Sequence, residues 1–127
     1  MSNIIEVIAT AALTAVGGVD IPSDIASPVS YAYGECRALN ALNQPYELDV
    51  GYHENYNKWL RNFFDIAGGK DELEGVSGDY DSIRPAKSKV ARELVLDEIT
   101  ATNLGERLDA CAITFRAMTE AMVDNWE

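Results

Sequence analysis

The pattern that most constrains the fold lies near the end of the chain. Apolar side chains recur there every three or four residues, at Leu104, Leu108, Cys111, Phe115, Met118, Met122 and Trp126. Charged residues occupy the other sides of the same segment. Because an α-helix completes a turn every 3.6 residues, this spacing places the apolar side chains on one face. The pattern predicts a long amphipathic helix whose apolar face is buried against other helices.

Four earlier segments also have the pattern expected of helices. They span about residues 3–16, 28–44, 52–67 and 85–101. Ser27 followed by Pro28 is a typical helix start, with serine as the N-cap and proline at the first helical position. Asn103, with Glu106 three residues later, is expected to cap the last helix. The sequence therefore predicts an all-α fold, a single-domain bundle of about five helices over residues 1–127.

Two parts of the chain depart from the clear helical pattern. Residues 68–83 contain four glycines and six charged side chains, with little apolar patterning. We expect them to form a long, acidic, glycine-rich surface loop. A short β element is the alternative at residues 94–96 and 47–50, because periodicity does not separate helix from strand over so few residues.

The first expected helix, residues 3–16, is apolar on nearly every side and ends at Gly17 and Gly18. Such a helix must be buried on several sides, either in the core of its own chain or against a neighbouring subunit. Residues 1–18 are therefore a candidate intersubunit arm, and a strand is the alternative because β-branched residues are frequent. The segment lacks the positive charge of a secretory signal and is shorter than the roughly 20 residues that cross a bilayer. We expect a cytoplasmic or virion-associated protein that is not secreted.

The chain is strongly acidic. It has 21 acidic and 10 basic residues, which gives a formal net charge of −11. Binding to phosphate backbones or anionic membranes needs clustered Lys and Arg, so we expect no direct nucleic-acid binding and no membrane association. A basic protein partner fits this charge, and so does a role in solubility alone. The one basic cluster, Arg84, Lys87, Lys89 and Arg92, is interpreted as a solvated helix face that pairs with its own acids.

The two cysteines, Cys36 and Cys111, are too few for a disulfide framework. Both fall on predicted apolar faces, so we expect two buried thiols and no bridge between them. One histidine and two distant cysteines do not make a convincing zinc site. We therefore expect no metal and no cofactor.

No group of residues has the pattern of a catalytic site. A nucleophile needs a base within reach, and the one histidine, His53, lies at an expected helix start, where a capping or exposed residue is typical. Glu93 and Asp97 are four residues apart on an expected helix, but the bases beside them favour an ion-paired surface. The acidic loop is interpreted as solvated, and a weak cation site is its alternative. The carboxylates of that alternative are Asp71, Glu72, Glu74, Asp79 and Asp81.

Apolar and aromatic side chains suggest where the protein meets partners. Phe63 and Phe64 are adjacent, so a single helix face cannot bury both, and one of them is expected to meet a partner or a second part of the core. The candidate interaction residues are Ile4, Ile5, Ile8, Phe63, Phe64 and Trp126. These residues predict protein partners, and the first expected partner is another copy of the same chain.

The order of elements resembles, in architecture, the small helical adaptor or head-completion proteins of tailed bacteriophages. The shared order is a helix (NIIEVIATAALTAVGG), a proline-containing connector (DIPSDIASP), a helix with the stretch ALNALN, and further helices. The resemblance contains no specific motif, so no functional residue is transferred from it. It implies a non-enzymatic structural protein that forms a ring between portal and tail, the head-to-tail connector of a virion.

Two other functions fit the same sequence. A small acidic inhibitor of the anti-restriction or anti-CRISPR type would place carboxylates in a basic groove made for DNA. A helical enzyme or small-molecule-binding domain would assemble its site from scattered polar residues. The residues available for its lining are Tyr31, Tyr33, Tyr52, His53, Glu54 and Tyr56.

Overall fold

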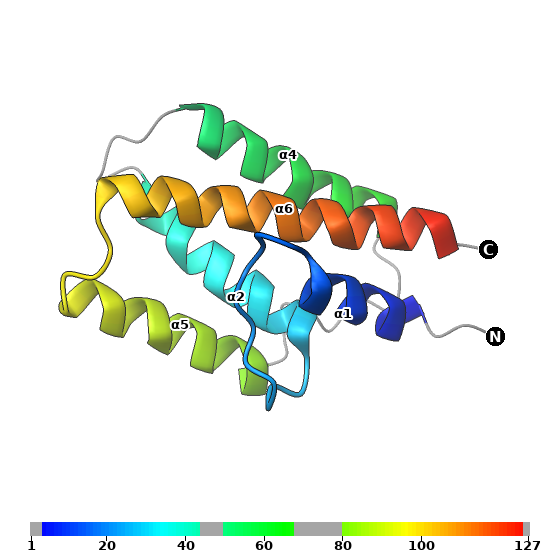
Figure 1. The fold of residues 1–127 in the computed structure, drawn as a ribbon, viewed down its shortest axis with the longest axis horizontal. Helices are drawn as coiled ribbons and strands as arrows, with labels where there is room; N and C mark the ends of the chain where they lie inside the picture. Colours follow the sequence, from blue (N-terminus) through cyan, green and yellow to red (C-terminus); the bar gives the residue numbers. More distant parts are fainter. Residues whose placement is uncertain (1–3, 44–49, 68–79, 126–127) are drawn as a thin grey trace.

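The computed structural model describes residues 4–43, 50–67 and 80–125, and this part of the chain folds as a bundle of five helices (Figure 1). The helices are α1 (Ile4–Thr14), α2 (Pro28–Ala41), α4 (Val50–Ala67), α5 (Tyr80–Val95) and α6 (Ala101–Asn125). No strand occurs within the described ranges. The predicted all-α bundle is confirmed. The β alternative at residues 94–96 is wrong because α5 includes Leu94 and Val95, and residues 47–49 lie outside the described ranges.

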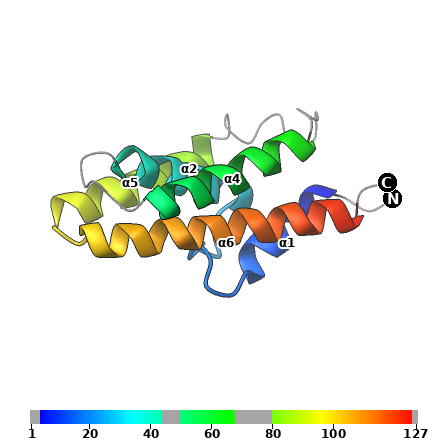
Figure 2. The same cartoon turned by 90° about the horizontal axis from the view of Figure 1, so that it is seen from above.

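Helix α6 is the longest element, and α4 lies on one side of it and α1 on the other (Figure 1, Figure 2). It packs against α4, α1 and α2, whereas α5 packs mainly against α2. α1 runs antiparallel to α6, so the start of α1 and the end of α6 lie at the same end of the molecule. The long helix predicted from the sequence is therefore a main packing partner of α4, α1 and α2.

The apolar face predicted for α6 forms the core. Its fully buried members are Leu104, Leu108, Cys111, Phe115, Met118 and Met122. Tyr56 and Phe63 of α4 meet Phe115 edge to face, with ring centroids 6.2 and 5.6 Å from it. Such contacts add to the stability that burial provides. The predicted core face of α6 is confirmed at these positions, while Trp126 lies outside the described residues.

The start of α5 differs from the prediction. The helix begins at Tyr80, so Pro85, which was expected at the helix start, lies inside it. The predicted loop at residues 68–83 is therefore too long at its C-terminal end, and its other residues lie outside the described ranges. The hydroxyl of Ser82 accepts a hydrogen bond of 2.9 Å from the backbone N–H of Ser27. This long-range contact ties the start of α5 to the start of α2.

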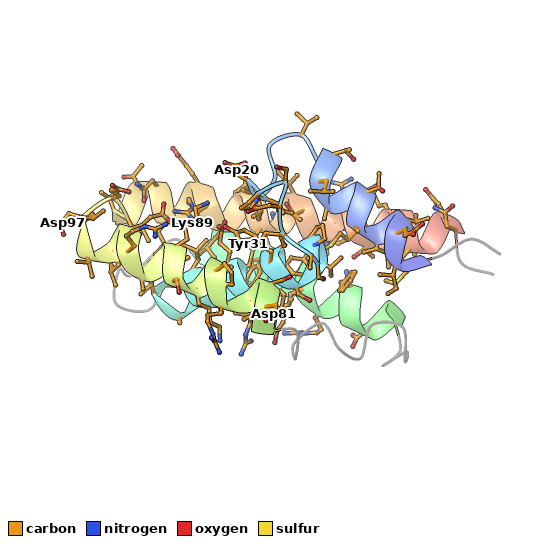
Figure 3. The ribbon with its side chains drawn as sticks, turned by 90° about the horizontal axis from the view of Figure 1, so that it is seen from below. Asp20, Tyr31, Asp81, Lys89 and Asp97 are labelled. Carbon is orange, nitrogen blue, oxygen red and sulfur yellow. A yellow bond between two sulfur atoms is a disulfide. The ribbon has the colours of Figure 1, made fainter. Side chains whose placement is uncertain are left out.

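The end of α5 is a Schellman turn. Asp97 has a φ of 57°, and Figure 3 shows it just beyond the end of the helix. The N–H of Glu98 donates to the carbonyl of Glu93 at 2.8 Å, and the N–H of Asp97 donates to the carbonyl of Leu94 at 3.2 Å. These bonds end the helix at Val95, so the predicted continuation is wrong. The predicted shared face of Glu93 and Asp97 is wrong for the same reason.

The N-cap of α6 is Thr100, not Asn103 as predicted. The N–H of Asn103 donates to Oγ1 of Thr100 at 3.3 Å, and the N–H of Thr100 donates to Oδ1 of Asn103 at 2.8 Å. This reciprocal pair is a capping box, with Asn103 three residues into the motif. The Nδ2 group of Asn103 also donates to the carbonyl of Glu98 at 2.7 Å, which fixes the connection between α5 and α6.

Helix α1, for which a strand was the alternative, packs in the core of its own chain along one side. Ile8 is fully buried there. After the helix, the backbone N–H of Val19 donates to Oγ1 of Thr114 on α6 at 2.7 Å. On the outer side of this segment Leu13 is 51% and Val16 is 94% exposed in the single chain, so the predicted burial against a neighbouring subunit stays a prediction there. α1 therefore belongs to the bundle and also carries an exposed apolar edge.

Candidate functional site

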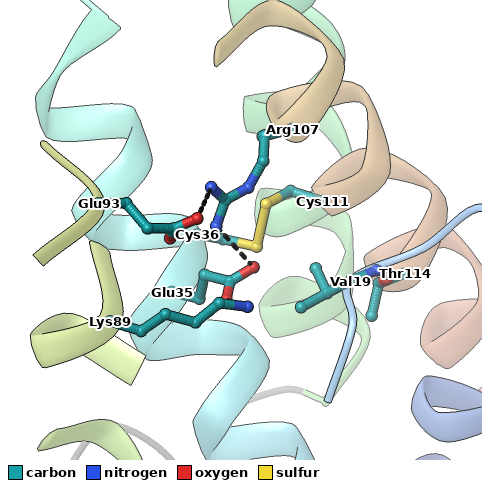
Figure 4. A network of polar contacts seen from close by, with 8 residues as sticks. All are labelled: Val19, Glu35, Cys36, Lys89, Glu93, Arg107, Cys111 and Thr114. Atoms are coloured by element: carbon teal, nitrogen blue, oxygen red, sulfur yellow. Dashed lines mark hydrogen bonds and ion pairs between the residues drawn. A yellow bond between two sulfur atoms is a disulfide. The ribbon is translucent and has the colours of Figure 1, made fainter. Parts of the chain in front are cut away.

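A group of charges around one buried carboxylate joins three helices. We call it the ion cluster, and it consists of Glu35 on α2, Lys89 and Glu93 on α5, and Arg107 on α6 (Figure 4). Nζ of Lys89 lies 3.2 Å from Oε1 of Glu35, and Nη2 of Arg107 lies 3.5 Å from Oε2 of the same carboxylate. Nη1 of Arg107 lies 2.9 Å from Oε2 of Glu93. Glu35 is 3% exposed, so its charge is removed from water and compensated by two bases.

Close packing of α2 and α5 brings the ion cluster together. A Cβ on Gly34 would lie 3.1 Å from backbone atoms of Ile83, so a larger residue would require α5 to shift by a few tenths of an ångström. Glu35 follows Gly34 on the buried side of α2, and Lys89 reaches it from the facing helix. The sequence predicts that Lys89 belongs to a solvated basic face that pairs with its own acids. Lys89 does pair with an acid of the chain, but that acid is a buried carboxylate across the helix interface, so the predicted solvated setting is wrong.

The pKa values of Lys89 and of the neighbouring Tyr31 are shifted in and beside the cluster. Burial alone would lower the pKa of Lys89, but the Glu35 carboxylate and the nearby Tyr31 hydroxyl outweigh burial, so the pKa of Lys89 is raised. Burial raises the pKa of Tyr31, against the opposing effect of Lys89. Tyr31 and Lys89 lie close together between α2 and α5 (Figure 3). Both groups therefore keep their protons in the folded state at a higher pH than in the unfolded chain.

A disulfide lies beside the ion cluster. Cys36 follows Glu35 on α2, Cys111 lies one turn after Arg107 on α6, and the two sulfurs are bonded (Figure 4). The Cα atoms are 5.9 Å apart and 75 residues separate the cysteines in the sequence. The prediction of two buried thiols is right about burial and wrong about the bridge. The two apolar faces that carry the cysteines pack directly against each other, and the spacing in the sequence does not reveal this.

The candidate interaction residues differ in burial in the structure. Ile8 and Phe63 are fully buried in the core and Ile5 packs against it, so Ile8 and Phe63 offer no surface to a partner in this structure. The side chains of Ile4, Phe64 and Trp126 are outside the described part of the structure. The exposed large apolar side chains that the structure does describe are Leu13, Val16, Val95, Leu96 and Val123.

The polar lining proposed for a ligand site is divided between two places. Tyr31 lies beside Lys89, whereas Tyr56 packs against Phe115 on α6. Tyr33 is half-buried, and the side chains of residues 52–54 are outside the described part. Among the described residues, no group of three or more His, Cys, Asp or Glu side chains is placed to hold a metal ion. Of the proposed cation ligands only Asp81 is described, and it is exposed in the first turn of α5.

The buried Tyr31 and Tyr56 and the half-buried Lys89 predict a loss of stability at alkaline pH. The ordinary pKa is 10.0 for Tyr31 and Tyr56 and 10.5 for Lys89, and folding raises all three, with burial the main cause for Tyr56. A raised folded-state pKa means that stability is constant below the unfolded pKa and falls as pH rises above it. We expect the free energy of unfolding to be constant from pH 7 to 9 and to fall above pH 10.

Urea unfolding at pH 8 and pH 11 measures this effect, and Tyr56→Phe separates one contribution. The Tyr56 hydroxyl is buried without a hydrogen-bond partner among the described residues. Its removal is therefore expected to cost little at pH 8, because a buried unpaired hydroxyl is itself unfavourable. The variant should also lose less stability at pH 11 than the wild type. An equal loss in the two proteins would contradict the assignment to Tyr56.

Neutralising Glu35 is expected to destabilise the bundle. Glu35→Gln keeps the shape of the side chain but leaves Lys89 and Arg107 without their shared counter-charge. Removing one partner of a buried pair costs about 3–5 kcal/mol. Because the side chains of Lys89 and Arg107 are 28% and 23% exposed, we expect a smaller loss, about 2 kcal/mol. Glu98→Gln, at an exposed acid after α5, is the matched control and should change stability by less than about 0.5 kcal/mol.

The charged groups of the ion cluster are paired with one another, and these pairs decide what the cluster can do chemically. Both oxygens of Glu35 contact bases of the same cluster, and the disulfide joins two of the three helices that carry it. The arrangement holds α2, α5 and α6 in fixed positions relative to one another.

Within the described ranges, no helix is long and apolar enough to cross a membrane. The chain matches no protein-family model, no curated protein and no solved structure.

Proposed function

We propose that this chain is a non-enzymatic assembly subunit that acts through protein–protein contacts with further copies, of the kind that forms the head-to-tail connector of a virion. The observation that carries the proposal is the exposure of large apolar side chains at two separate places on a tightly packed bundle. Val16 is 94% exposed at the end of α1, and Val95 is 80% exposed at the end of α5. Exposed apolar groups that occur together favour an interaction surface.

The first apolar surface, Leu13 and Val16, is next to α6. The turn that follows Val16 contacts that helix, since a methyl group on Gly17 would lie 3.6 Å from Cδ1 of Ile113. The second surface consists of Val95 and Leu96, on the Schellman turn of α5. Both surfaces lie at helix ends that hydrogen bonds hold in place. Rigid surfaces lose little conformational entropy on binding, which favours their use in an assembly.

The disulfide also supports an assembly that leaves the cell. Disulfides persist on virions, on cell surfaces and in other oxidising surroundings, and they are rare in the cytosol. A cross-link between α2 and α6 would stabilise a subunit that functions in an extracellular particle. This favours the virion over the cytoplasm as the place where the protein works.

The absolute mass of the purified protein in solution tests the proposal. Size-exclusion chromatography with light scattering should show a discrete species of several copies at moderate salt. Leu13→Glu with Val16→Glu should reduce its mass toward that of the 13.9 kDa chain while the helical circular dichroism is unchanged. Thr14→Glu, an exposed position on the same helix, is the matched control and should leave the mass unchanged. A wild-type protein that is monomeric at every salt concentration would overturn the proposal.

A further inference from the structure

The outer side of α5 is basic in a protein whose overall charge is −11. Arg84, Lys87 and Arg92 are exposed on the outer half of this helix, and the exposed Asp81 lies on the same half in its first turn. None of them forms an ion pair within the described part of the chain. Lys89 points the other way, into the ion cluster. We call Arg84, Lys87 and Arg92 the basic face.

The outer side of α6 is acidic. Glu106, Asp109, Glu120 and Asp124 recur at helical spacing on one side of this helix. Arg116 lies at its edge, bonded to Glu120 at 2.8 Å and stacked over Trp59 of α4. The other three carboxylates form no ion pair among the described residues. We call Glu106, Asp109, Glu120 and Asp124 the acidic face.

We propose that the basic face of α5 in one copy of the chain binds the acidic face of α6 in the next copy. This inference rests on the proposed function and names its partner and its surfaces. The two faces lie on different helices, and α5 packs mainly on α2 and not on α6. Contact between two different surfaces is heterologous, so it repeats from copy to copy and closes into a ring when the rotation allows.

Each face has one of the exposed apolar surfaces beside it. Val95 continues the basic face, three residues after Arg92. Leu13 and Val16 adjoin the acidic face, where the turn after α1 contacts Ile113, four residues after Asp109. Exposed ion pairs contribute little affinity singly, but complementary charges set orientation and exclude wrong partners. Apolar contact supplies affinity, and charge complementarity selects which surfaces meet.

The net charge makes the expected salt dependence distinctive. At about 10 mM salt the Debye length is about 30 Å, so two copies repel each other through their whole charge. Near 0.15 M it is about 8 Å, which screens distant charges while the facing charges still attract. At about 1 M it is about 3 Å, and the facing pairs are weakened too. Association should therefore be strongest at moderate salt and weaker on both sides of it.

Charge reversal on each face tests the contact. The first variant combines Arg84→Glu with Lys87→Glu, and the second combines Glu106→Lys with Asp109→Lys. Arg84, Lys87 and Glu106 are exposed and Asp109 is half-buried, and circular dichroism checks that both variants fold. At 0.15 M salt each variant alone should have the mass of a single chain. A mixture of the two should again associate, because the unaltered α5 of the second variant meets the unaltered α6 of the first, and the two reversed faces are again opposite in charge.

Asp24→Lys with Glu98→Lys is the matched control for the second variant. It makes the same change in net charge at exposed acids outside the acidic face, so it should assemble like the wild type. If the wild type assembles and both reversed variants keep its mass, this contact is wrong while the assembly function stands. If the wild type is a single chain at every salt concentration, both proposals fall. A single chain that binds polylysine would then favour the acidic inhibitor.

Discussion

Reduction of the Cys36–Cys111 disulfide is expected to lower the free energy of unfolding by about 4 kcal/mol. The bond closes a segment of 75 residues that contains α4 and α5. Without the bond, the unfolded chain has more conformational entropy, and this gain grows with the length of the loop that the bond closes. Domains of this size are stabilised by only about 5–15 kcal/mol in total. Loss of the bond is therefore expected to remove a large share of the stability.

Denaturation with and without a phosphine reductant measures the effect of the disulfide. Both cysteines are fully buried, so the bond should be reduced in denaturant and the protein then refolded with reductant present. The double variant Cys36→Ala with Cys111→Ala is the control, and its stability should not respond to reductant. Two alkylated thiols in the mass spectrum of non-reduced, denatured protein would show that the bond is absent.

Phe115→Ala is expected to lower the free energy of unfolding by about 3–5 kcal/mol. Phe115 is fully buried at the middle of α6 and receives the edges of Tyr56 and Phe63 from α4. Truncation removes its own apolar surface from the core and leaves a cavity that two large rings cannot fill without moving. The loss should therefore exceed the transfer free energy of the side chain alone.

Chemical denaturation of Phe115→Ala checks this value against two other positions on α6. Leu108→Ala, also fully buried, should cost about 2–5 kcal/mol. Val123→Ala is the exposed control on the same helix, and its effect should stay within about 0.5 kcal/mol. If all three variants unfolded at the same denaturant concentration, the core assigned to α6 would be wrong.

Much of the fold follows from local patterns in the sequence. The apolar spacing on α6 predicts its buried face from Leu104 to Met122, and Ser27 with Pro28 marks the start of α2. Oγ of Ser27 indeed accepts a hydrogen bond from the backbone of Ser30 in the structure. These signals are local because backbone geometry alone decides which side chains share a helical face and which hydroxyl reaches a free N–H.

Local signals were less reliable at helix ends. Asn103 and Thr100 are both good capping residues, and the structure uses Thr100 as the cap because Asn103 then bonds back to it and to the carbonyl of Glu98. The end of α5 depends on Asp97 adopting a left-handed conformation. Glycine is the usual residue there, so an aspartate gives a weak signal.

The candidate site depends on tertiary structure almost entirely. Lys89 looks like any surface lysine in the sequence, and only packing of α5 on α2 turns it toward Glu35. Glu35 lies on the otherwise apolar buried side of α2. A shift of one helical turn between the packed helices would leave its charge buried without a base. The periodicity within α2, α5 or α6 does not show which charged residues pair, because the two partners of each pair lie on different helices.

The sequence by itself determined where the helices form, which of their faces are apolar, and how acidic the protein is. The tertiary structure decided which faces meet. It joined Cys36 to Cys111 across 75 residues, grouped the ion cluster, and separated a basic α5 face from an acidic α6 face. The physical reason is the range of the interactions. Helix periodicity and capping act within a few residues of the chain, whereas the partners of a side chain are set by how whole helices pack.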